Sequence, residues 1–361
     1  MAHISPDTAS RLKPDLLPVV HTLYTQMCNL QPGEKVLVIS DARTPFELVA
    51  AFQGMAMTLG AEAVVIEASI PYGGPTSQPG ASWSSMVAAA ALEANLIIDL
   101  AVGYAEFISA AMDRGARVLM PGDGIGGPYL DDMLIRNIRD VDIHALRRSA
   151  GRIAQRFTEA SKISLITGGS DLLEIDISGL RGEPVDGFLW DPDKGEFKSN
   201  YEIMPPAQPG VMIPKGRANG TVCVEGVVLW HQVYHECPRE DLRLTFENSR
   251  LVDLQGDRNL ANRVRRWLET LGDDGAWEGP NHFNIGINPN AMLSQNQEWE
   301  RIYGSVTCGM GDMSTAGKLL SAGSSMEYAA SSVHWDWTIL QPEILLDDEV
   351  LVRGGVVHDA E

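Results

Sequence analysis

Cysteine is scarce in the sequence, and its placement limits what it can do. The four cysteines, Cys28, Cys223, Cys237 and Cys308, are irregularly spaced, and none belongs to a C-x-x-C motif. A zinc knuckle or a disulfide framework is therefore not expected, and reduced thiols indicate a cytoplasmic protein. The sequence also lacks any run of about 18 uninterrupted apolar residues, so we expect no membrane-spanning segment.

Positive charge is also scarce. Among 361 residues, 48 are acidic and 28 are basic, which gives a formal net charge of −20. Such a chain repels nucleic acid and anionic lipid, so neither is expected as a partner. The first residues lack a basic segment followed by an apolar core, so no secretory signal is expected. The chain has 44% hydrophobic residues, enough to bury a core, and its length favours two domains.

Strands and helices alternate in the first part of the chain. Short apolar runs predict strands at residues 35–40, 63–68, 96–100 and 117–120, and longer patterns predict helices at 45–59, 83–94 and 138–158. Apolar strands separated by helices are typical of a parallel sheet that is covered on both faces. We therefore predict a Rossmann-like α/β domain over residues 1–160.

The second part of the chain has a different pattern. Strands are predicted at 162–167, 172–177, 221–229, 242–246 and 344–352, with a helix at 259–271. Strands separated by turns predict a mainly antiparallel α+β domain over residues 161–361, and we place the functional site there. The segment 204–220 is rich in proline, which lacks the N–H group that a central strand or helix requires. It is predicted to be a loop near the functional site or at the interdomain cleft.

The segment SSVHWDWTIL, residues 331–340, has the strongest chemical pattern in the sequence. In an extended strand, residues two apart point to the same face, so His334 and Asp336 project together. Trp335 and Trp337 then line the opposite face and pack into the core. The histidine and aspartate fit either two ligands of a metal site or a hydrogen-bonded pair on a sheet face.

A second histidine stands in the segment NHFNIGINPN, residues 281–290. Here His282 precedes a strand and turn that contain Gly286 and Pro289. A histidine in this setting can lie at a strand end that faces a cleft, where it would supply a third metal ligand. The alternative is a surface or capping histidine.

Together, these segments resemble a family of bacterial metalloenzymes. The motifs that carry the resemblance are HFNIGINPNA, GSVTCGMGD, SVHWDWTI and EILLDDEVLVRGGVV, within residues 221–357. The family has two branches, the leucyl-aminopeptidase-like enzymes and the 2,5-dihydroxypyridine 5,6-dioxygenases. The resemblance covers most of the chain and is looser in the N-terminal part.

Two positions separate the branches. The aminopeptidase-like branch has a glutamate where this chain has His282 and a histidine where it has Thr307. The dioxygenase branch has a histidine at the first position and keeps the His-x-Asp pair, as this chain does with His334 and Asp336. The resemblance therefore implies the dioxygenase ligand set, which is His282, His334 and Asp336.

Two imidazoles and one carboxylate form the facial triad of non-haem Fe(II) enzymes. The resemblance implies a mononuclear Fe(II) dioxygenase that uses O₂ to cleave the ring of a small hydroxylated N-heterocycle or aromatic acid in a catabolic pathway. The same ligands would also accept zinc or manganese. We further expect that the protein is a homo-oligomer.

The chain departs from the dioxygenase pattern at two histidines. The family has one histidine after the strand at 96–100 and another in the region of 201–205, and this chain has neither. Tyr104 and Glu202 lie in these regions and are predicted to act in proton transfer instead. The alternative is a metal-assisted hydrolase of the same fold, either aminopeptidase-like or a deaminase of a 2-aminomuconate-type ring-cleavage product.

Overall fold

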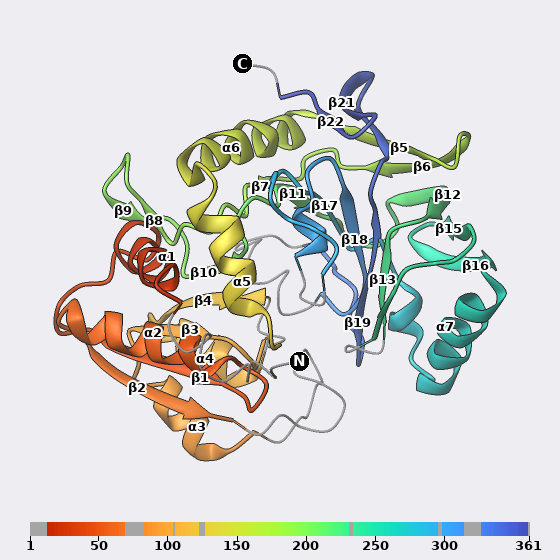
Figure 1. Cartoon of the computed structure of the whole chain (residues 1–361). Helices are drawn as coiled ribbons and strands as arrows, with labels where there is room; N and C mark the ends of the chain where they lie inside the picture. The colour runs from red at the N-terminus through yellow and green to blue at the C-terminus, as the bar shows by residue number, and fades with distance from the viewer. Residues whose placement is uncertain are drawn as a thin grey trace, which may run out of the picture. The chain divides into compact units, whose positions relative to one another are not determined.

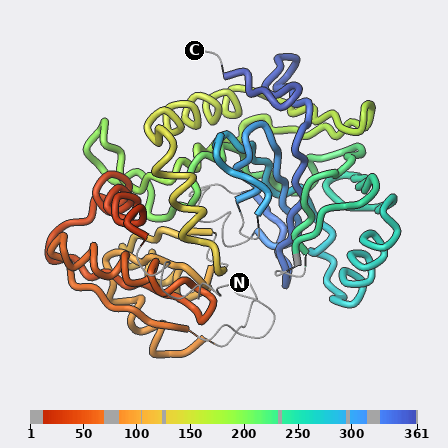
Figure 2. The backbone as a smooth tube through the Cα atoms, viewed as in Figure 1, coloured from red at the N-terminus to blue at the C-terminus, as the bar shows by residue number. Residues whose placement is uncertain are grey.

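The computed structural model describes residues 13–68, 83–103, 105–122, 127–230, 234–294, 298–313 and 326–359. The chain forms two compact units. The first contains Met1–Ile70, Trp83–Asp142 and Gly187–Pro205, and the main segments of the second are Ile143–Asp186 and Pro206–Glu361. Figure 2 follows the chain as it leaves the first unit and later returns to it.

A parallel sheet forms the centre of the first unit (Figure 1). In spatial order, its strands are β10 (Tyr201–Met204), β4 (Arg117–Pro121), β3 (Leu96–Asp99), β1 (Lys35–Ser40) and β2 (Glu62–Glu67). All neighbouring pairs run parallel. The strands β3 and β4 are buried along their whole length, which explains why their sequences are mostly apolar.

The first unit also contains several helices in addition to this sheet. The first unit contains α1 (Leu16–Thr22), α2 (Phe46–Thr58), α3 (Ser85–Ala91), α4 (Glu106–Asp113) and α5 (Leu130–Leu134), the π-helical turns η1 (Leu23–Met27) and η3 (Ile135–Arg139), and a hairpin of β8 (Trp190–Asp191) and β9 (Glu196–Phe197). Helix α1 packs on α2, and α3 packs on α4. Helix α3 begins where the Ser84 hydroxyl accepts a hydrogen bond from the backbone N–H of Met86, at 3.3 Å.

Antiparallel sheets form the second unit. One of them, sheet B, has in spatial order the strands β16 (Arg250–Gly256), β15 (Leu242–Glu247), β12 (Ala218–Val224), β6 (Asp171–Asp176), β5 (Lys162–Thr167), β20 (Glu343–Leu346), β21 (Glu349–Arg353) and β22 (Val356–Val357). The other, sheet C, has β14 (Tyr234–Glu236), β13 (Val227–Trp230), β19 (His334–Ile339), β18 (Val306–Gly311), β17 (His282–Ile285), β11 (Gly210–Met212) and β7 (Gly182–Glu183). Figure 1 shows β17, β18 and β19 side by side in sheet C.

Helices α6 (Ile143–Glu159) and α7 (Arg258–Leu271) pack on these sheets. Helix α6 contacts β7 and β11, whereas α7 contacts β16. Helix α7 begins after Asp257, whose carboxylate accepts a hydrogen bond from the backbone N–H of Leu260 at 3.1 Å. It ends at Gly272, which adopts the left-handed conformation with φ 61°. The second unit also contains the 3₁₀ turns η4 (Asp274–Trp277) and η5 (Trp299–Arg301).

The apolar core of the second unit lies against one face of sheet C. Trp335 and Trp337 of β19 are buried in the same apolar cluster as Phe246 of sheet B. The rings of Phe246 and Trp337 lie 6.2 Å apart. The predicted burial of both tryptophans is thus confirmed. Because side chains alternate along a strand, His334 and Asp336 project from the opposite face.

The parallel sheet in the first part of the chain and the antiparallel sheets in the second confirm the predicted mixed α/β architecture. The two units differ in detail from a division at residue 160. Helix α6 belongs to the second unit, because it packs against β7 and β11. Residues 187–205 belong to the first unit, where β10 extends the parallel sheet.

Three predictions about the second part of the chain are wrong. Residues 344–352 form two strands instead of one, because the chain turns at Asp347 and Asp348 between β20 and β21. Residues 221–229 contribute to two strands instead of one, because the chain turns at Glu225 and Gly226 and passes from sheet B to sheet C. The segment 204–220 is not a loop throughout, because Gly210–Met212 form β11. Prolines flank this short strand and do not interrupt its hydrogen bonds.

Candidate metal centre

Three neighbouring strands of sheet C position the predicted ligands. His282 begins β17, His334 and Asp336 belong to β19, and β18 runs between these two strands. The register places His282 opposite Gly309 of β18, and Gly309 opposite Asp336 of β19. Directly opposite residues of antiparallel strands point to the same face, so the side chains of His282 and Asp336 meet across β18.

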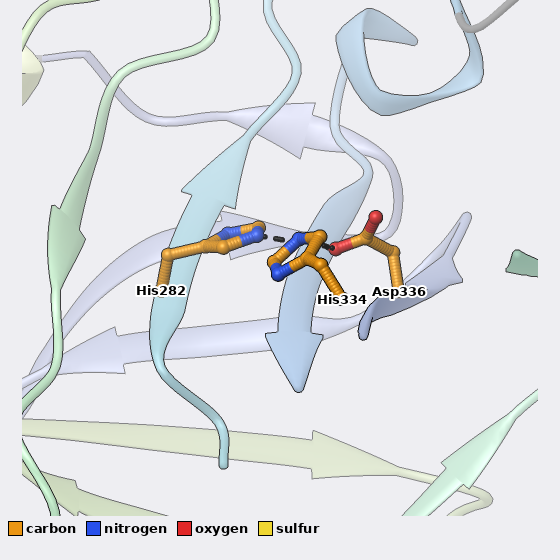
Figure 3. A group of neighbouring side chains, drawn as sticks. All are labelled: His282, His334 and Asp336. Atoms are coloured by element: carbon orange, nitrogen blue, oxygen red, sulfur yellow. Dashed lines mark hydrogen bonds and ion pairs between the residues drawn. The ribbon is translucent and has the colours of Figure 1, made fainter. Parts of the chain in front are cut away.

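The three side chains converge, as Figure 3 shows. One candidate ligand atom from each lies within 4.8 Å of the other two. Oδ1 of Asp336 lies 3.1 Å from Nε2 of His282 and 3.0 Å from Nε2 of His334. In the described part of the chain, this is the one cluster of three or more His, Cys, Asp or Glu side chains as close as this. The structure therefore brings together the three residues that the sequence singles out.

Gly309 leaves the space that this arrangement needs. A Cβ atom at this position would overlap Cδ2 and Nε2 of the His282 imidazole. The φ angle of Gly309 is not positive, so the requirement for glycine is steric and not conformational. The sequence analysis missed this residue. A glycine in the middle of the segment VTCGMG is the signal that could have found it, because a glycine inside a strand often marks a close approach.

The proline-rich segment borders the site. Met212 in β11 lies directly opposite His282 in β17. The predicted location of the segment 204–220 near the site is therefore confirmed, although its predicted lack of regular structure is wrong.

The orientation of one imidazole is fixed by the backbone. Nδ1 of His334 lies 2.8 Å from the carbonyl oxygen of Asp312. A carbonyl oxygen only accepts, so Nδ1 donates its hydrogen and Nε2 is the nitrogen that faces Asp336. This is the usual arrangement for a metal-ligating histidine, whose second nitrogen is held by a hydrogen bond.

Burial and charge act in opposite directions on these groups. Burial alone would lower the pKa of His334, but the carboxylate of Asp336 and the carbonyl of Asp312 outweigh it and raise the pKa to about 9. Burial alone would raise the pKa of Asp336, but the two imidazoles hold this pKa well below its ordinary value. The site therefore stabilises one positive charge, which is either a proton on an imidazole or a cation.

The donor set suits a divalent cation. Two imidazole nitrogens and one carboxylate oxygen are ligands that Fe(II), zinc and manganese accept. Nδ1 of His334 has its supporting hydrogen bond, whereas Nδ1 of His282 is buried and has no partner among the described residues. The role of the three side chains as metal ligands stays a prediction.

The position that distinguishes the hydrolase-like branch holds a buried hydroxyl. The hydroxyls of Thr307 and Thr338, on neighbouring strands, lie 2.8 Å apart. Thr307 is two residues before Gly309 on β18, so it points to the same face as the candidate ligands. This threonine pair provides no imidazole, so the described residues offer one group of three ligands and not the larger set of a two-metal site.

The other predicted site residues are not part of this cluster. Tyr104 lies outside the described residues. Glu202 is buried in β10 of the first unit. Its carboxylate accepts a hydrogen bond from the backbone N–H of Gly187 at 3.0 Å and lies 3.6 Å from Nζ of Lys198. For Tyr104 and Glu202, a role in proton transfer stays a prediction.

A parallel α/β unit joined to antiparallel sheets that carry a His–His–carboxylate cluster defines a class of metal-dependent enzymes. Within this class, the family model for 2,5-dihydroxypyridine 5,6-dioxygenase matches residues 19–359, so the chain belongs to that family. The protein is accordingly a metal-dependent, ring-cleaving dioxygenase. This finding confirms the dioxygenase branch that the ligand pattern implied.

Solved structures show the same fold. The 2,5-dihydroxypyridine dioxygenase from Pseudomonas putida KT2440 has a TM-score of 0.76 and 15% sequence identity, over 96% of this chain and 97% of that chain. Wild-type AmpT from Thermus thermophilus has a TM-score of 0.64 and 15% identity, over 96% of this chain and 99% of that one. No curated protein matches the sequence. Among the described residues, no helix has the length and apolar character needed to cross a membrane.

Proposed function

We propose that His282, His334 and Asp336 bind one Fe(II) ion and that the protein cleaves the ring of a small hydroxylated N-heterocycle or aromatic acid. The dioxygenase family suggests 2,5-dihydroxypyridine as the first substrate to test. The observation that carries the proposal is the convergence of two imidazole nitrogens and one carboxylate oxygen. When bound by such a triad, Fe(II) supplies the activation of O₂ beside the substrate.

The residues of the chain prepare the site for this chemistry. The hydrogen bond from Nδ1 of His334 to the Asp312 carbonyl keeps Nε2 directed at the site. Burial holds the carboxylate of Asp336 against both imidazoles and away from competing water. Three protein ligands leave other coordination positions open for substrate and O₂. Zinc and manganese are the alternative metals, because the same donor atoms accept them.

We also propose that the first unit is a Rossmann-like domain and that the two units act as separate domains. The strand order β2-β1-β3-β4, with all pairs parallel, supports this proposal. In doubly wound sheets of this order, successive strands are added toward one edge and then, from the third strand on, toward the other. Ligands often bind at the point between the first and third strands where this order reverses. A homo-oligomer in the cytoplasm is the expected form of the protein.

Proton transfer during ring cleavage is assigned to Glu202 and Tyr104. The assignment of Glu202 is supported by its buried carboxylate in β10, and the assignment of Tyr104 is based on the sequence alone. Glu202→Gln and Tyr104→Phe should lower kcat and leave the metal content unchanged. An unchanged kcat in either variant would remove that residue from the mechanism.

Oxygen uptake under defined metal loading tests the proposed reaction. Metal-free protein would be loaded anaerobically with Fe(II), Zn(II) or Mn(II), and O₂ uptake would be followed after addition of 2,5-dihydroxypyridine. We expect uptake in proportion to product with Fe(II), and loss of activity when a chelator removes the metal. Substrate consumption without O₂ would instead favour a metal-assisted hydrolase, which is the weaker alternative.

A further inference from the structure

Asn281 is a buried residue beside the candidate metal centre, and its carboxamide has a fixed orientation. It directly precedes β17 and is 2% exposed. Its Nδ2 donates a hydrogen bond to the carbonyl oxygen of Gly311, at 2.9 Å. Because a carbonyl oxygen only accepts, the amide nitrogen must face Gly311, and Oδ1 must face the other way.

Oδ1 of Asn281 faces the space above Gly309. A Cβ atom built on Gly309 would lie 2.6 Å from Oδ1 of Asn281 and would overlap Nε2 of His282. Oδ1 of Asn281 and Nε2 of His282 therefore border the same small space, which exists because residue 309 has no side chain. The missing side chain thus makes room for the imidazole and also for this oxygen.

Oδ1 of Asn281 has no hydrogen-bond partner among the described residues. A buried acceptor without a partner costs about 1–3 kcal/mol, and native proteins satisfy nearly all such groups. Nδ2 has a hydrogen-bond partner at Gly311, whereas Oδ1 has none, so the cost falls on the oxygen. A hydroxyl donor that enters the space above Gly309 would remove this cost.

We propose that Oδ1 of Asn281 accepts a hydrogen bond from a hydroxyl group at the metal centre and thereby positions it. This inference rests on the proposed function, because it requires an occupied metal site. The hydroxyl can belong to the substrate ring or to a water molecule at the metal. Both sources offer the same O–H donor, and the experiment separates them.

The test compares Asn281→Leu with wild type in two anaerobic titrations. The first titration measures the Kd for Zn(II), a redox-inert probe, with metal-free protein. The second measures the Kd for 2,5-dihydroxypyridine with the Zn(II)-loaded protein. The conservative variant Asn281→Gln retains both an amide donor for the Gly311 carbonyl and an oxygen acceptor, and should stay within about threefold of wild type in both titrations.

Asn137 provides a matched control in the first unit. It is also fully buried, and its Nδ2 donates to the carbonyl oxygen of Met133 at 2.9 Å. Asn137→Leu should lower the melting temperature and leave both Kd values unchanged. It therefore shows whether loss of a buried asparagine by itself affects binding.

We expect Asn281→Leu to weaken one of the two Kd values about tenfold, the effect of losing one hydrogen bond. A weaker Kd for 2,5-dihydroxypyridine alone identifies a ring hydroxyl as the donor, whereas a weaker Kd for Zn(II) identifies water. If both constants stay within about twofold of wild type, or if Asn281→Gln loses as much as Asn281→Leu, the proposal is wrong. Should Asn281→Leu fail to fold, Asn281→Ala removes the same oxygen and replaces it in both titrations.

Failure of the proposed function would look different. Wild-type protein would then bind no Zn(II) or Fe(II), and a chelator would leave its activity unchanged. A wild type that binds metal, together with Asn281 variants that bind metal and substrate normally, would remove only the role of Asn281.

Discussion

Two buried aspartates, one in each unit, show how different surroundings set the charge of the same side chain. Asp99 at the end of β3 accepts hydrogen bonds from the backbone N–H groups of Ala101, Val102 and Gly103, at 3.0, 2.8 and 2.8 Å. Burial outweighs these three bonds and raises the pKa of Asp99 to about 7. Asp336 is equally buried, but its pKa lies well below the ordinary value because two imidazoles face it.

Backbone dipoles alone therefore do not keep a fully buried carboxylate strongly anionic, whereas ionisable partners do. Asp99 closes the turn after β3 with hydrogen bonds that a neutral acid also accepts in part. Asp336 instead stays anionic and is paired with a positive charge that can be exchanged. Such an exchangeable charge is what a metal site requires, because metal binding releases protons from its ligands.

The largest effect is expected from removing the charge of Asp336, with the same change at Asp99 as the control. Asp336→Asn should weaken Zn(II) or Fe(II) binding more than about hundredfold, because losing a ligand costs more than the 10–100-fold effect of an outer-shell change. Activity should be lost, and the fold should persist because Trp335 and Trp337 stay buried. Asp99→Asn should leave the metal affinity unchanged. Titration calorimetry and metal analysis of both variants check this, and equal losses of metal affinity in both would show that the different surroundings of the two aspartates do not govern metal binding.

The next largest effect is expected from filling the space above Gly309, between β17 and β19. In Gly309→Ala, the new methyl group would overlap the imidazole of His282, so that imidazole must move away from Asp336. We expect metal affinity to fall about 10–100-fold and the free energy of unfolding to fall by about 1–3 kcal/mol.

Gly151 in helix α6 is the matched control for this change. A Cβ atom there would meet nothing within 4 Å. Gly151→Ala should raise the free energy of unfolding by about 0.4–1 kcal/mol and leave metal binding unchanged. If Gly309→Ala binds metal as tightly as Gly151→Ala does, the close approach above β18 is not needed.

These variants also show which parts of the fold could be predicted from sequence. The strands at residues 35–40 and 162–167 are found where predicted, because each is a short run rich in apolar residues. The return of residues 201–204 to the parallel sheet could not be predicted, because that pairing joins distant segments and leaves no local pattern. The turn at Glu225 and Gly226 was missed because apolar residues, Val224 and Val227, flank it on both sides.

The residues of the candidate site likewise fall into those that the sequence predicts and those that it does not. His334 and Asp336 follow from the two-residue period of a strand, which is local information. His282 required the family resemblance, since its neighbours alone leave a capping role open. Gly309 and Asn281 depend on the register of β17 against β18, and this register can be read only from the folded structure.

A smaller effect is expected in the pH dependence of stability. The folded pKa of Asp99, about 7, exceeds the unfolded value near 3.9, so its stabilising contribution is full below about pH 4 and is lost as pH rises through about 7. Between pH 5 and pH 8, wild type should lose on the order of 2 kcal/mol more than Asp99→Asn. Urea unfolding of both proteins at the two pH values measures this difference. Parallel pH profiles would mean that Asp99 is already ionised at pH 5.

The smallest effect on the protein is expected from modifying its thiols. Burial raises the pKa of Cys28 in the first unit to about 12, and burial and the nearby Asp336 charge raise the pKa of Cys308 in the second well above its usual value. The thiolate is the reactive form, so neither should react with a thiol reagent at pH 8, whereas the exposed Cys237 should. Mass spectrometry after timed labelling, with denatured protein as the control, identifies the modified residues.

Labelling of Cys237 should leave metal affinity and melting temperature unchanged. Cys308 is the informative thiol, because it precedes Gly309 on β18 and points into the core on the opposite face from the candidate ligands. Its protection therefore reports how rigidly β18 is held between β17 and β19. Rapid labelling of Cys308 in the native protein would show that β18 opens readily. The close approach of His282 over Gly309 to Asp336 would then be one arrangement among several, and the contrast between the two buried aspartates would lose its structural basis.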